Sequence, residues 1–424
     1  MAQQLDASAV EEVGDARARC RFCGAALEHT LVDLGPQPLC ESFVPPERAN
    51  ELEPFFPLHV WICDRCFLVQ LEEYVRPEEI FEEYAYFSSY STSWVEHARR
   101  YADEMTERLG LAADSLVVEV GSNDGYLLQH FAAKGIPVLG IEPAANVAAR
   151  AGERGLPTLV EFFGVEVAER LVAEGRRADL LLGNNVFAQV PDLNDFVAGL
   201  SILLADDGVL TLEFPHLVNL IEGNQFDTIY HEHFSYFSFG TTRAIFAAHG
   251  LEVFDVDELP THGGSLRVYG QRSGGPRPTT AAVEELDRRE EELGYRTLQP
   301  YAAFPERVAE TKRALLEFLI DAKRSGATVA GYGAPGKGNT LLNYCGIRTD
   351  FLDYTVDRNP YKHGMLLPGT RIPIFPPERL AETRPDYILI LPWNLRDEIV
   401  AQLAYAREWG ARFVVPIPTV EVVA

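Results

Sequence analysis

A glycine-rich turn that directly follows a buried-strand pattern constrains the fold of this chain more than any other segment. Residues 117–120 are mostly valines, residues 121–125 form the turn, and an apolar helix pattern starts at Leu127. A strand, turn and helix in this order are typical of the first unit of a doubly wound α/β fold, whose ligand lies at the carboxyl end of the strand. A strand–turn–helix corner without a ligand is the alternative.

The acidic residues of this turn indicate which ligand it could bind. The turn reads E-x-G-x-x-x-G, from Glu119 to Gly125, rather than G-x-G-x-x-G, and it also contains Asp124. These carboxylates disfavour a pyrophosphate, and Glu142, after the next strand-like run, could bind both hydroxyls of a ribose. The groups suit a cationic nucleoside such as S-adenosylmethionine (SAM), which carries a sulfonium and an ammonium group.

Length and charge narrow the class of protein. The chain has 424 residues, of which 47% are hydrophobic, and this length predicts about two or three domains. Residues 1–18 are polar and acidic, so we expect a disordered lead and a cytoplasmic protein rather than a signal peptide. The formal net charge of −26 disfavours nucleic acid and anionic membranes as partners. An anionic substrate would therefore need a local basic pocket.

Strand and helix patterns alternate along most of the chain and predict an α/β fold in three parts. Residues 19–75, rich in Cys, Pro and Phe, predict a small metal-binding domain. Residues 76–275 predict a Rossmann-like domain, and residues 276–424 predict a second one that begins with charged helices. The expected strands lie at 116–120, 138–141, 158–160, 180–182, 209–214, 251–256 and 266–270, and then at 328–332, 354–356, 387–391 and 412–416.

Four of the six cysteines form two C-x-x-C pairs, Cys20 with Cys23 and Cys63 with Cys66. Two such pairs beside short strands are the usual way to build a tetrahedral thiolate site for zinc. Because four thiolates leave no open coordination position, we expect the zinc to be structural. A redox pair is the alternative, and the remaining two cysteines are expected to be ordinary thiols.

A run of polar residues after the expected strand at 209–214 is the main candidate for catalysis. Tyr230, His231, Glu232 and His233 stand in succession. An imidazole oriented by a nearby carboxylate could act as a general base, and a tyrosine could donate a hydrogen bond to developing negative charge. A metal site is disfavoured because the histidines lie two residues apart rather than four. A solvated loop is the other alternative.

A second polar segment, T-H-G-G-S-L-R, opens a later strand after two glycines. It offers backbone amides, the hydroxyl of Ser265 and the guanidinium of Arg267 to a polar or anionic ligand, with His262 beside them. A plain hairpin turn is equally consistent with this pattern.

A glycine loop near the C-terminus could bind phosphate. It follows one expected strand, precedes a helix and contains Gly333, Lys337 and Asn339. Amides at a helix N-terminus together with one lysine resemble a phosphate cradle, although the loop is neither a Walker A motif nor a clean G-x-G-x-x-G motif. Lys362 follows the next strand, so Lys337, Lys362 and Arg267 could clamp a diphosphate.

The cysteine quartet, the acidic glycine turn, Y-H-E-H-F and G-Y-G-A-x-x-K-G-N-T, in this order, resemble the C-methyltransferases of antibiotic deoxysugar biosynthesis. Those enzymes act on nucleotide-linked 4-keto sugars, with thymidine diphosphate (dTDP) as the usual carrier. The resemblance covers about residue 19 to residue 417. It implies a monomeric enzyme with a zinc-binding lobe, a SAM-binding middle domain and a second Rossmann-like domain that helps to hold the nucleotide sugar.

The resemblance also implies roles for individual residues. It places catalysis on Tyr230, Glu232, His233 and Tyr84, or on Tyr86 if the alignment shifts by two. The SAM contacts that it implies are Glu119, Gly121, Ser122, Asn123, Asp124, Gly125, Glu142, Asn184 and Asn185. The candidate substrate contacts are Tyr86, Gln189, His231, His262, Ser265, Arg267, Gly333, Lys337, Asn339 and Lys362.

One residue departs from the family pattern. Family members commonly read N-N-V-x-A-H-V-P, whereas this chain has Gln189 at the position of the histidine. A side chain that can shuttle protons is thus replaced by one that can only hydrogen-bond. The change puts in doubt any role assigned to this position and could mark a different substrate or ring position.

These assignments predict SAM-dependent methylation of the carbon, expected to be C3, beside the ketone of a dTDP-4-keto-deoxyhexose. His233, supported by Glu232, would remove the acidified proton, while Tyr84 and Tyr230 would stabilise the enolate oxygen. Holding both reactants in register could supply ~7–11 kcal/mol of the barrier. Methylation at C5, an NAD-dependent nucleotide-sugar oxidoreductase and a non-catalytic SAM- or sugar-binding protein are the alternatives.

Overall fold

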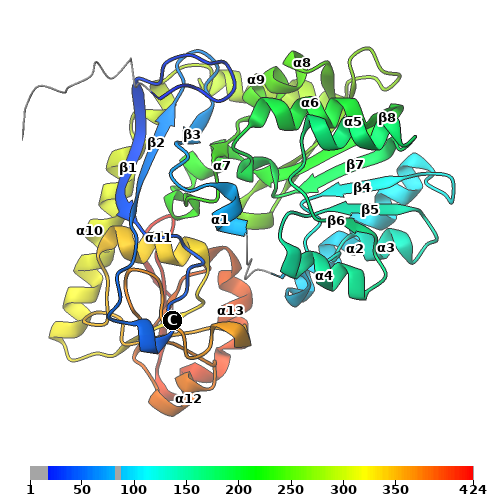
Figure 1. Ribbon diagram of the computed structural model, residues 1–424. Helices are drawn as coiled ribbons and strands as arrows, with labels where there is room; N and C mark the ends of the chain where they lie inside the picture. The colour runs from blue at the N-terminus through cyan, green and yellow to red at the C-terminus, as the bar shows by residue number, and fades with distance from the viewer. Residues whose placement is uncertain (1–17, 82–86, 424) are drawn as a thin grey trace, which may run out of the picture.

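The computed structural model describes residues 18–81 and 87–423, which form three sheets (Figure 1). The α/β fold expected from the sequence is confirmed: a small antiparallel sheet in the cysteine-rich lobe and two mostly parallel sheets. None of the helices in the described part of the chain combines the length and apolar character that a bilayer crossing requires.

The first sheet joins the cysteine-rich lobe to a segment from the middle of the chain. Its strands, in spatial order, are β1 (His29–Gln37), β2 (Phe56–Ile62), β3 (Val69–Leu71) and β9 (Ser235–Tyr236). β9 begins two residues after His233 and pairs antiparallel with β3, and the amide of Leu71 donates to the carbonyl of Phe234 (3.0 Å). The candidate catalytic segment is therefore attached to the cysteine-rich lobe.

The middle sheet has the strand order β10-β11-β8-β7-β4-β5-β6. Its strands are β4 (Val117–Val120), β5 (Val138–Ile141), β6 (Thr158–Leu159), β7 (Ala178–Asn184), β8 (Leu204–Pro215), β10 (Leu251–Leu259) and β11 (Ser265–Arg272). β4 to β8 are parallel, and β11 runs antiparallel between β8 and β10. Because β5 and β7 flank β4, the order in which strands are added to the sheet reverses at β4, and a crevice forms beyond the carboxyl ends of these strands.

Helices cover both faces of the middle sheet. The helices of this part of the chain are α1 (Pro77–Phe81), α2 (Thr92–Leu109), α3 (Leu128–Ala132), α4 (Ala145–Glu153), α5 (Val165–Ala173), α6 (Leu193–Leu203), α7 (Leu217–Glu222) and α8 (Phe239–Ala248). α5 and α6 cover one face, while α2 and α3 cover the other (Figure 1). Val118 and Val120 pack against the first pair and Val117 against the second, so β4 is buried on both sides, as its valine run requires.

The C-terminal sheet repeats this plan. Its spatial order is β14 (Ile374–Phe375), β13 (Thr355–Val356), β12 (Val329–Tyr332), β15 (Tyr387–Ile390), β16 (Arg412–Val415) and β17 (Glu421–Val423). The helices that follow β11 are α9 (Ala281–Glu292), α10 (Phe304–Arg324), α11 (Gly336–Cys345), α12 (Arg379–Thr383) and α13 (Arg396–Gln402). β13 and β15 flank β12, so the glycine loop after β12 lies at a second reversal point.

The cysteine-rich lobe does not have a core of its own. Leu31 of β1 and Val60 of β2 belong to one apolar cluster with Leu315 of α10 and Leu341 of α11. Figure 1 shows α10 running alongside β1. The domain boundaries expected from the sequence stay a prediction, since this core is shared between the first and last parts of the chain.

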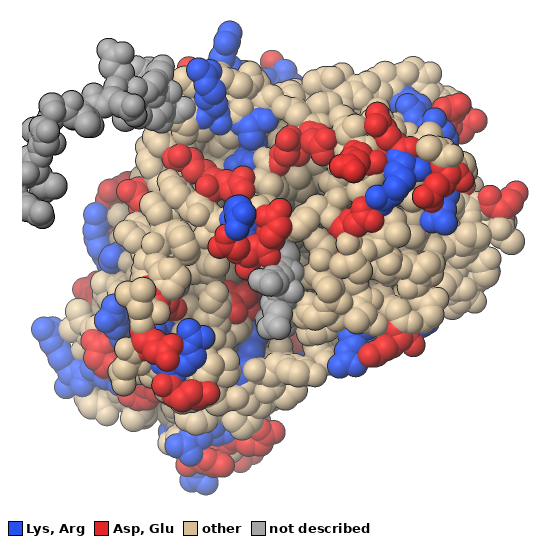
Figure 2. Space-filling view, in the orientation of Figure 1, with Lys and Arg blue, Asp and Glu red and all other residues tan. Residues whose placement is uncertain are grey.

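Basic and acidic side chains lie close together on the surface (Figure 2). On the face shown in Figure 2, Lys and Arg side chains lie beside Asp and Glu side chains rather than in a field of their own. Ion pairs of this kind in the structure include Arg99 with Glu96 (2.6 Å) and Arg288 with Glu285 (2.7 Å), each between neighbouring turns of one helix. Where such pairs form, the basic charge at the surface is locally neutralised.

Candidate active site

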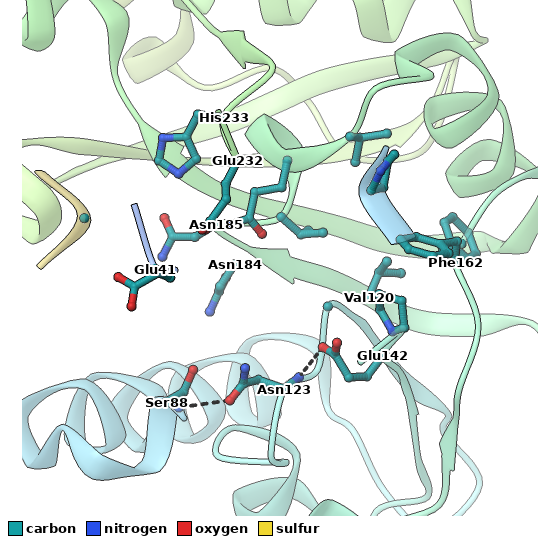
Figure 3. A pocket seen from close by; sticks show the side chains of 18 of the residues that line it. Glu41, Ser88, Val120, Asn123, Glu142, Phe162, Asn184, Asn185, Glu232 and His233 are labelled. Carbon is teal, nitrogen blue, oxygen red and sulfur yellow. Dashed lines mark hydrogen bonds between the residues drawn. The ribbon is translucent and has the colours of Figure 1, made fainter. Parts of the chain in front are cut away.

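A cavity of 540 Å³ lies between the reversal points of the two parallel sheets. Figure 3 shows Asn123 and Glu142 on one side of it, and Glu41, Glu232 and His233 on the other. The predicted site residues that line it are Gly121, Asn123, Glu142, Asn184, Asn185, Gln189, Tyr230, Glu232, His233, His262, Lys337 and Lys362. Candidate SAM, catalytic and substrate residues therefore meet in one space.

The glycine turn after β4 needs its glycines for two physical reasons. Gly125 has φ +78°, and a Cβ there would lie 2.3 Å from a side-chain carbon of Leu156, so no larger residue fits. Gly121 has φ +68°, and its Cβ position lies 3.0 Å from Val186, next to the cavity. Because Gly121 and Gly125 have no side chains, the backbone of the turn can lie close to a ligand.

Glu142 is held at the end of β5 by backbone amides. Its Oε2 accepts from the amide of Asn123 and its Oε1 from the amide of Ala144, both at 2.9 Å. Burial raises the pKa of Glu142, and these two amides oppose the shift. Each oxygen keeps a second lone pair, so both can accept from a ribose hydroxyl as well.

His233 has a defined tautomer and a buried ring. Its Nδ1 lies 3.2 Å from the carbonyl oxygen of Thr228, which can only accept, so Nδ1 carries the proton and Nε2 carries a lone pair. Burial lowers the pKa of His233 to about 4, and the positive charge of Lys337 contributes to the shift. At neutral pH the ring is therefore an unprotonated base. The sequence assigned its orientation to Glu232, whereas the structure shows the carbonyl of Thr228 in that role.

Tyr230 and Glu232 lie beside this base. The rings of Tyr230 and His233 are 4.1 Å apart, and burial raises the pKa of Tyr230 well above its usual value, so the phenol stays protonated and can donate. Oε1 of Glu232 accepts from the thiol of Cys40 at 3.5 Å. The cavity thus offers a base, a phenol and a carboxylate close together.

Two lysines enter the cavity from the C-terminal sheet. Lys337, at the start of α11, donates to Asn394 (2.8 Å) and lies 4.8 Å from the ring centre of Trp393. Burial lowers the pKa of Lys337, and the carboxylate of Asp227 opposes the shift. Lys362 donates to the carbonyl of Ala334 (2.8 Å). These are the cations that a negatively charged group would meet at this end of the cavity.

Comparison with known proteins gives three family models in succession along the chain. They are described as "Putative zinc binding domain" for residues 20–81, "Methyltransferase domain" for residues 94–256 and "C-methyltransferase C-terminal domain" for residues 260–418. C-methyltransferase NovU from Streptomyces niveus is 39% identical over 405 residues, which cover 96% of this chain and 96% of NovU. The chain belongs to this C-methyltransferase family. The methyltransferase activity expected from the sequence is thereby confirmed, and the oxidoreductase and non-catalytic alternatives are not supported.

Solved methyltransferase structures match part of this methyltransferase. Magnesium protoporphyrin IX methyltransferase (ChlM) from Synechocystis PCC 6803 with bound SAM is 14% identical, with 48% of this chain and 100% of ChlM covered and a TM-score of 0.34. A SAM-dependent methyltransferase from Clostridium acetobutylicum ATCC 824 is 9% identical, with 43% of this chain and 92% of that protein covered and a TM-score of 0.34. The family assignment rests on NovU and the family models, not on these partial matches.

The methyltransferase uses SAM as its methyl donor, and the residues around the glycine turn fit this molecule. Glu119 is fully buried, and neither of its carboxylate oxygens has a hydrogen-bond partner among the described residues. Ser122 Oγ, Asp124 Oδ1 and Asn184 Nδ2 are also buried without such a partner. Of these residues, Asn184 lines the cavity, whereas Glu119, Ser122 and Asp124 lie behind its wall. Buried polar groups are normally paired, so the set fits a ligand next to the turn that brings its own donors and acceptors. The ammonium, carboxylate and ribose groups of SAM do so.

The predicted zinc site is confirmed. The four Sγ atoms of Cys20, Cys23, Cys63 and Cys66 lie within 4.8 Å of one another. Four sulfurs at about 2.3 Å from one ion in a tetrahedron lie about 3.8 Å apart, so the quartet fits zinc. Gln70 of β3 donates to Cys20 Sγ (3.2 Å), a contact outside the ligand set of the kind that orients a metal ligand.

Arg267 does not line the cavity, although we predicted it as part of a diphosphate clamp. It lies opposite Glu213 in the register of β11 and β8, and its guanidinium forms a buried ion pair with that carboxylate (2.7 Å). It also stacks on the ring of Tyr101, 4.5 Å from the ring centre. The charge of Arg267 is therefore paired with Glu213 inside the middle domain rather than directed at the cavity.

Other predicted substrate contacts also lie behind the cavity wall. Nε2 of His231 donates to the carbonyl of Pro57 (3.1 Å), and Ser265 Oγ donates to the carbonyl of Thr261 (3.0 Å). The residues of this group that do not line the cavity are His231, Ser265, Arg267, Gly333 and Asn339. Tyr84 and Tyr86 lie outside the described residues, so their assignments stay predictions.

Several residues that line the cavity were not predicted from the sequence. Cys40 and Glu41 come from the loop between β1 and β2, far from the other site residues in sequence. Trp94 lines the cavity from the first turn of α2. Phe162 and Phe163 follow β6, the next parallel strand, so the rule that ligands bind at the carboxyl ends of such strands could have found them.

Proposed function

We propose that this C-methyltransferase methylates C3, the carbon beside the ketone, in a dTDP-linked 4-keto-deoxyhexose. The observation that carries the proposal is the orientation of His233, which presents an unprotonated Nε2 to a cavity shared by the candidate SAM turn and Lys337. The preference for C3 over C5 rests on the resemblance described above.

The ketone makes the neighbouring C–H bond acidic because the electron pair left behind moves onto the ketone oxygen. Nε2 of His233 takes the proton, and Nδ1–H keeps its bond to Thr228, which stabilises the imidazolium that forms. Its low pKa keeps the ring unprotonated at neutral pH. The negative charge that develops on the enolate oxygen favours the imidazolium once the proton has moved.

The phenol of Tyr230 is placed to donate to the enolate oxygen. Its raised pKa keeps it a donor throughout the neutral range, and its ring contact with His233 places it beside the base. We assign Glu232 to orienting the sugar or the base, and Tyr84, with Tyr86 as the alternative, to a second phenol donor. SAM, when bound, supplies an electrophilic methyl group on its sulfonium.

Two observations support a nucleotide-linked sugar. Lys337 and Lys362 enter the cavity from the C-terminal sheet, and both can pair with a diphosphate. His262 and Gln189 also line the cavity, and the Nε2 of His262 lies 3.2 Å from the side-chain amide of Asn185. We assign His262 and Gln189 to substrate contact, Asn184 and Asn185 to SAM.

We also propose that the enzyme acts as a monomer in the cytoplasm. In this proposal residues 19–75 form the zinc-binding domain, 76–275 the SAM domain and 276–424 the domain that contributes to nucleotide-sugar binding. The shared core of the first and last parts means that they work as one unit.

The test is incubation with SAM and a panel of 4-keto nucleotide sugars, followed by product mass and NMR assignment of the new methyl group. A gain of one methyl at C3 is expected, whereas methylation at C5 would overturn the ring position. Incubation in D2O without methyl transfer should also exchange the C3 proton, and His233→Gln should abolish that exchange. Unchanged masses across the whole panel would overturn the substrate class.

A further inference from the structure

A loop of the zinc-binding lobe forms part of the cavity wall. Cys40 and Glu41 line the cavity next to Tyr230, Glu232 and His233. Cys40 is buried, with 3% of its surface exposed, and it is not one of the four zinc ligands. A thiol in the reaction cavity that does not bind metal needs a separate explanation.

The thiol of Cys40 contacts the carboxylate that precedes the base. Its Sγ lies 3.5 Å from Oε1 of Glu232, and a carboxylate oxygen can only accept from it. Burial raises the pKa of Cys40 well above its usual value, and the charges of Glu232 and Glu41 add to the shift while Lys362 opposes it. Cys40 is therefore a neutral thiol that can donate.

The loop that carries Cys40 is fixed on its other side by the C-terminal domain. Val44 and Leu366 exchange two backbone hydrogen bonds, of 3.0 and 2.8 Å. A carboxylate oxygen of Glu41 lies 3.6 Å from Nζ of Lys362. A Cβ on Gly336 would lie 3.1 Å from Cys40 Sγ, so the thiol also rests against the glycine loop. Cys40 thus has a defined place from which to hold Glu232.

We propose that Cys40 is a positioning residue, whose S–H group donates to Glu232 and fixes that carboxylate beside His233. The inference rests on the proposed function, in which Glu232 orients the sugar or the base. A hydrogen bond to an ionised carboxylate is stronger than one between neutral groups, so even a thiol donor can restrict the rotation of Glu232. The zinc-binding lobe then contributes to the reaction through this contact as well as to folding.

Serine and alanine replacements separate this role from simple packing. Cys40→Ser keeps a donor, and Cys40→Ala removes it at similar volume. We expect Cys40→Ala to lower kcat roughly 10-fold, with the KM for the sugar and the affinity for SAM each within about twofold of wild type. Cys40→Ser should recover kcat to within about twofold. The matched control is Cys345→Ala in α11, which is buried away from the cavity.

The pH profile gives a readout that packing would not change. A donor to a carboxylate favours the ionised form. The acid limb of the kcat profile, which reports the enzyme–substrate complex rather than the free enzyme, should therefore move to higher pH in Cys40→Ala and return in Cys40→Ser. An unchanged kcat and acid limb in Cys40→Ala would overturn the proposal. Equal losses in the serine and alanine variants, with equal pH profiles, would also overturn it.

A double-mutant cycle tests the pair directly. In a Glu232→Gln background, Cys40→Ala should cost less than twofold in kcat, because the charged acceptor is gone. A loss of the same size in both backgrounds would show that Cys40 acts through the fold and would overturn the proposal. Failure of the wild-type enzyme to methylate any sugar in the panel is a different result, since it overturns the proposed function itself.

Discussion

The indole Nε1–H of Trp393, in the C-terminal domain, donates to the buried carboxylate of Asp227 at 2.7 Å. Asp227 directly precedes Thr228, whose carbonyl fixes the tautomer of His233. Lys337 lies over the face of the same indole. Lys337, which is expected to meet the diphosphate, is thus linked through Trp393 and Asp227 to the segment that holds His233.

Replacing Asp227 should change how stability depends on pH. Burial raises the pKa of Asp227 from its usual 3.8 to about 6. A raised pKa means that the folded state binds this proton more tightly, so its stabilising contribution is complete below about pH 4 and is lost as the pH rises through 6. Asp227→Asn cannot ionise. The free energy of unfolding of wild type relative to Asp227→Asn should therefore fall by about 3 kcal/mol between pH 3.5 and pH 7.

Denaturant unfolding of both proteins across this range measures the difference. Asp350→Asn, at an exposed position, serves as the control. A difference for Asp227→Asn that does not change with pH would mean that its carboxyl is not buried as described.

His233→Gln should abolish methylation. A glutamine of similar length can occupy the site but cannot take a proton, and loss of a general base typically costs about 10²–10⁴-fold in rate. SAM binding, followed by calorimetry, should stay within a few-fold of wild type. His231→Gln is the neighbouring control, because that ring contacts Pro57 rather than the cavity. Turnover near the wild-type rate in His233→Gln would exclude His233 as the base.

The pH profile of the free enzyme should reflect the low pKa of His233. Because this pKa is about 4 rather than near 6.5, the base is unprotonated from about pH 5 upwards, and kcat/KM should fall only when the pH approaches 4. Lys337→Met should move this acid limb to higher pH, since Lys337 helps to lower the pKa. Initial rates from pH 4 to 8 measure both effects.

Glu119→Gln should stabilise the enzyme without SAM and weaken SAM binding. Burial, together with Glu142 and Asp124, raises the pKa of Glu119 well above its usual value, so its ionised form is costly in the folded protein. The variant should gain stability over wild type as the pH rises towards 8, seen as a higher melting temperature. Its SAM affinity should fall roughly 10- to 100-fold, because the charged partner for the ligand is lost.

Glu169→Gln, on the exposed face of α5, should change neither quantity. Equal SAM affinity in Glu119→Gln and wild type would remove Glu119 from the donor site.

Loss of zinc should impair catalysis more than SAM binding. The Cys20 thiolate is bonded to Gln70 of β3, and β3 pairs with β9, which directly follows the catalytic segment. Tyr126 and Leu127, at the end of the SAM turn, pack in a cluster with α2 and α3 that includes no described residue of the cysteine-rich lobe. Cys63→Ser, or a strong chelator, should therefore lower kcat by at least 10-fold before SAM affinity changes. Metal analysis should give one zinc per chain, and Cys345→Ser should retain it.

Much of the fold could be predicted because buried parallel strands have a recognisable local sequence pattern. The runs that form β4, β5 and β12 are mostly apolar segments followed by glycine or an acidic residue, and such a pattern can be read without knowing distant contacts. The zinc quartet could be predicted for the same reason, since its spacing alone specifies a tetrahedral site.

The site residues that could not be predicted depend on contacts between distant segments. Arg267 looked like an anion ligand because the sequence does not show that the register of β11 places it opposite Glu213. The link from Thr228 to His233 uses a backbone carbonyl, which has no sequence signature. Cys40 lies in a loop without periodicity, and only the packing of three segments brings it to Glu232.

β9 has one further implication, for anyone who wishes to recombine enzymes of this family. The two-residue strand is encoded within the methyltransferase region but completes the sheet of the zinc-binding lobe. A chimaera cut at the apparent domain borders would pair β3 from one parent with β9 from another. A poor fit between these two strands would displace His233, which lies two residues before β9. Active hybrids should therefore be found among those in which β3 and β9 come from the same parent enzyme.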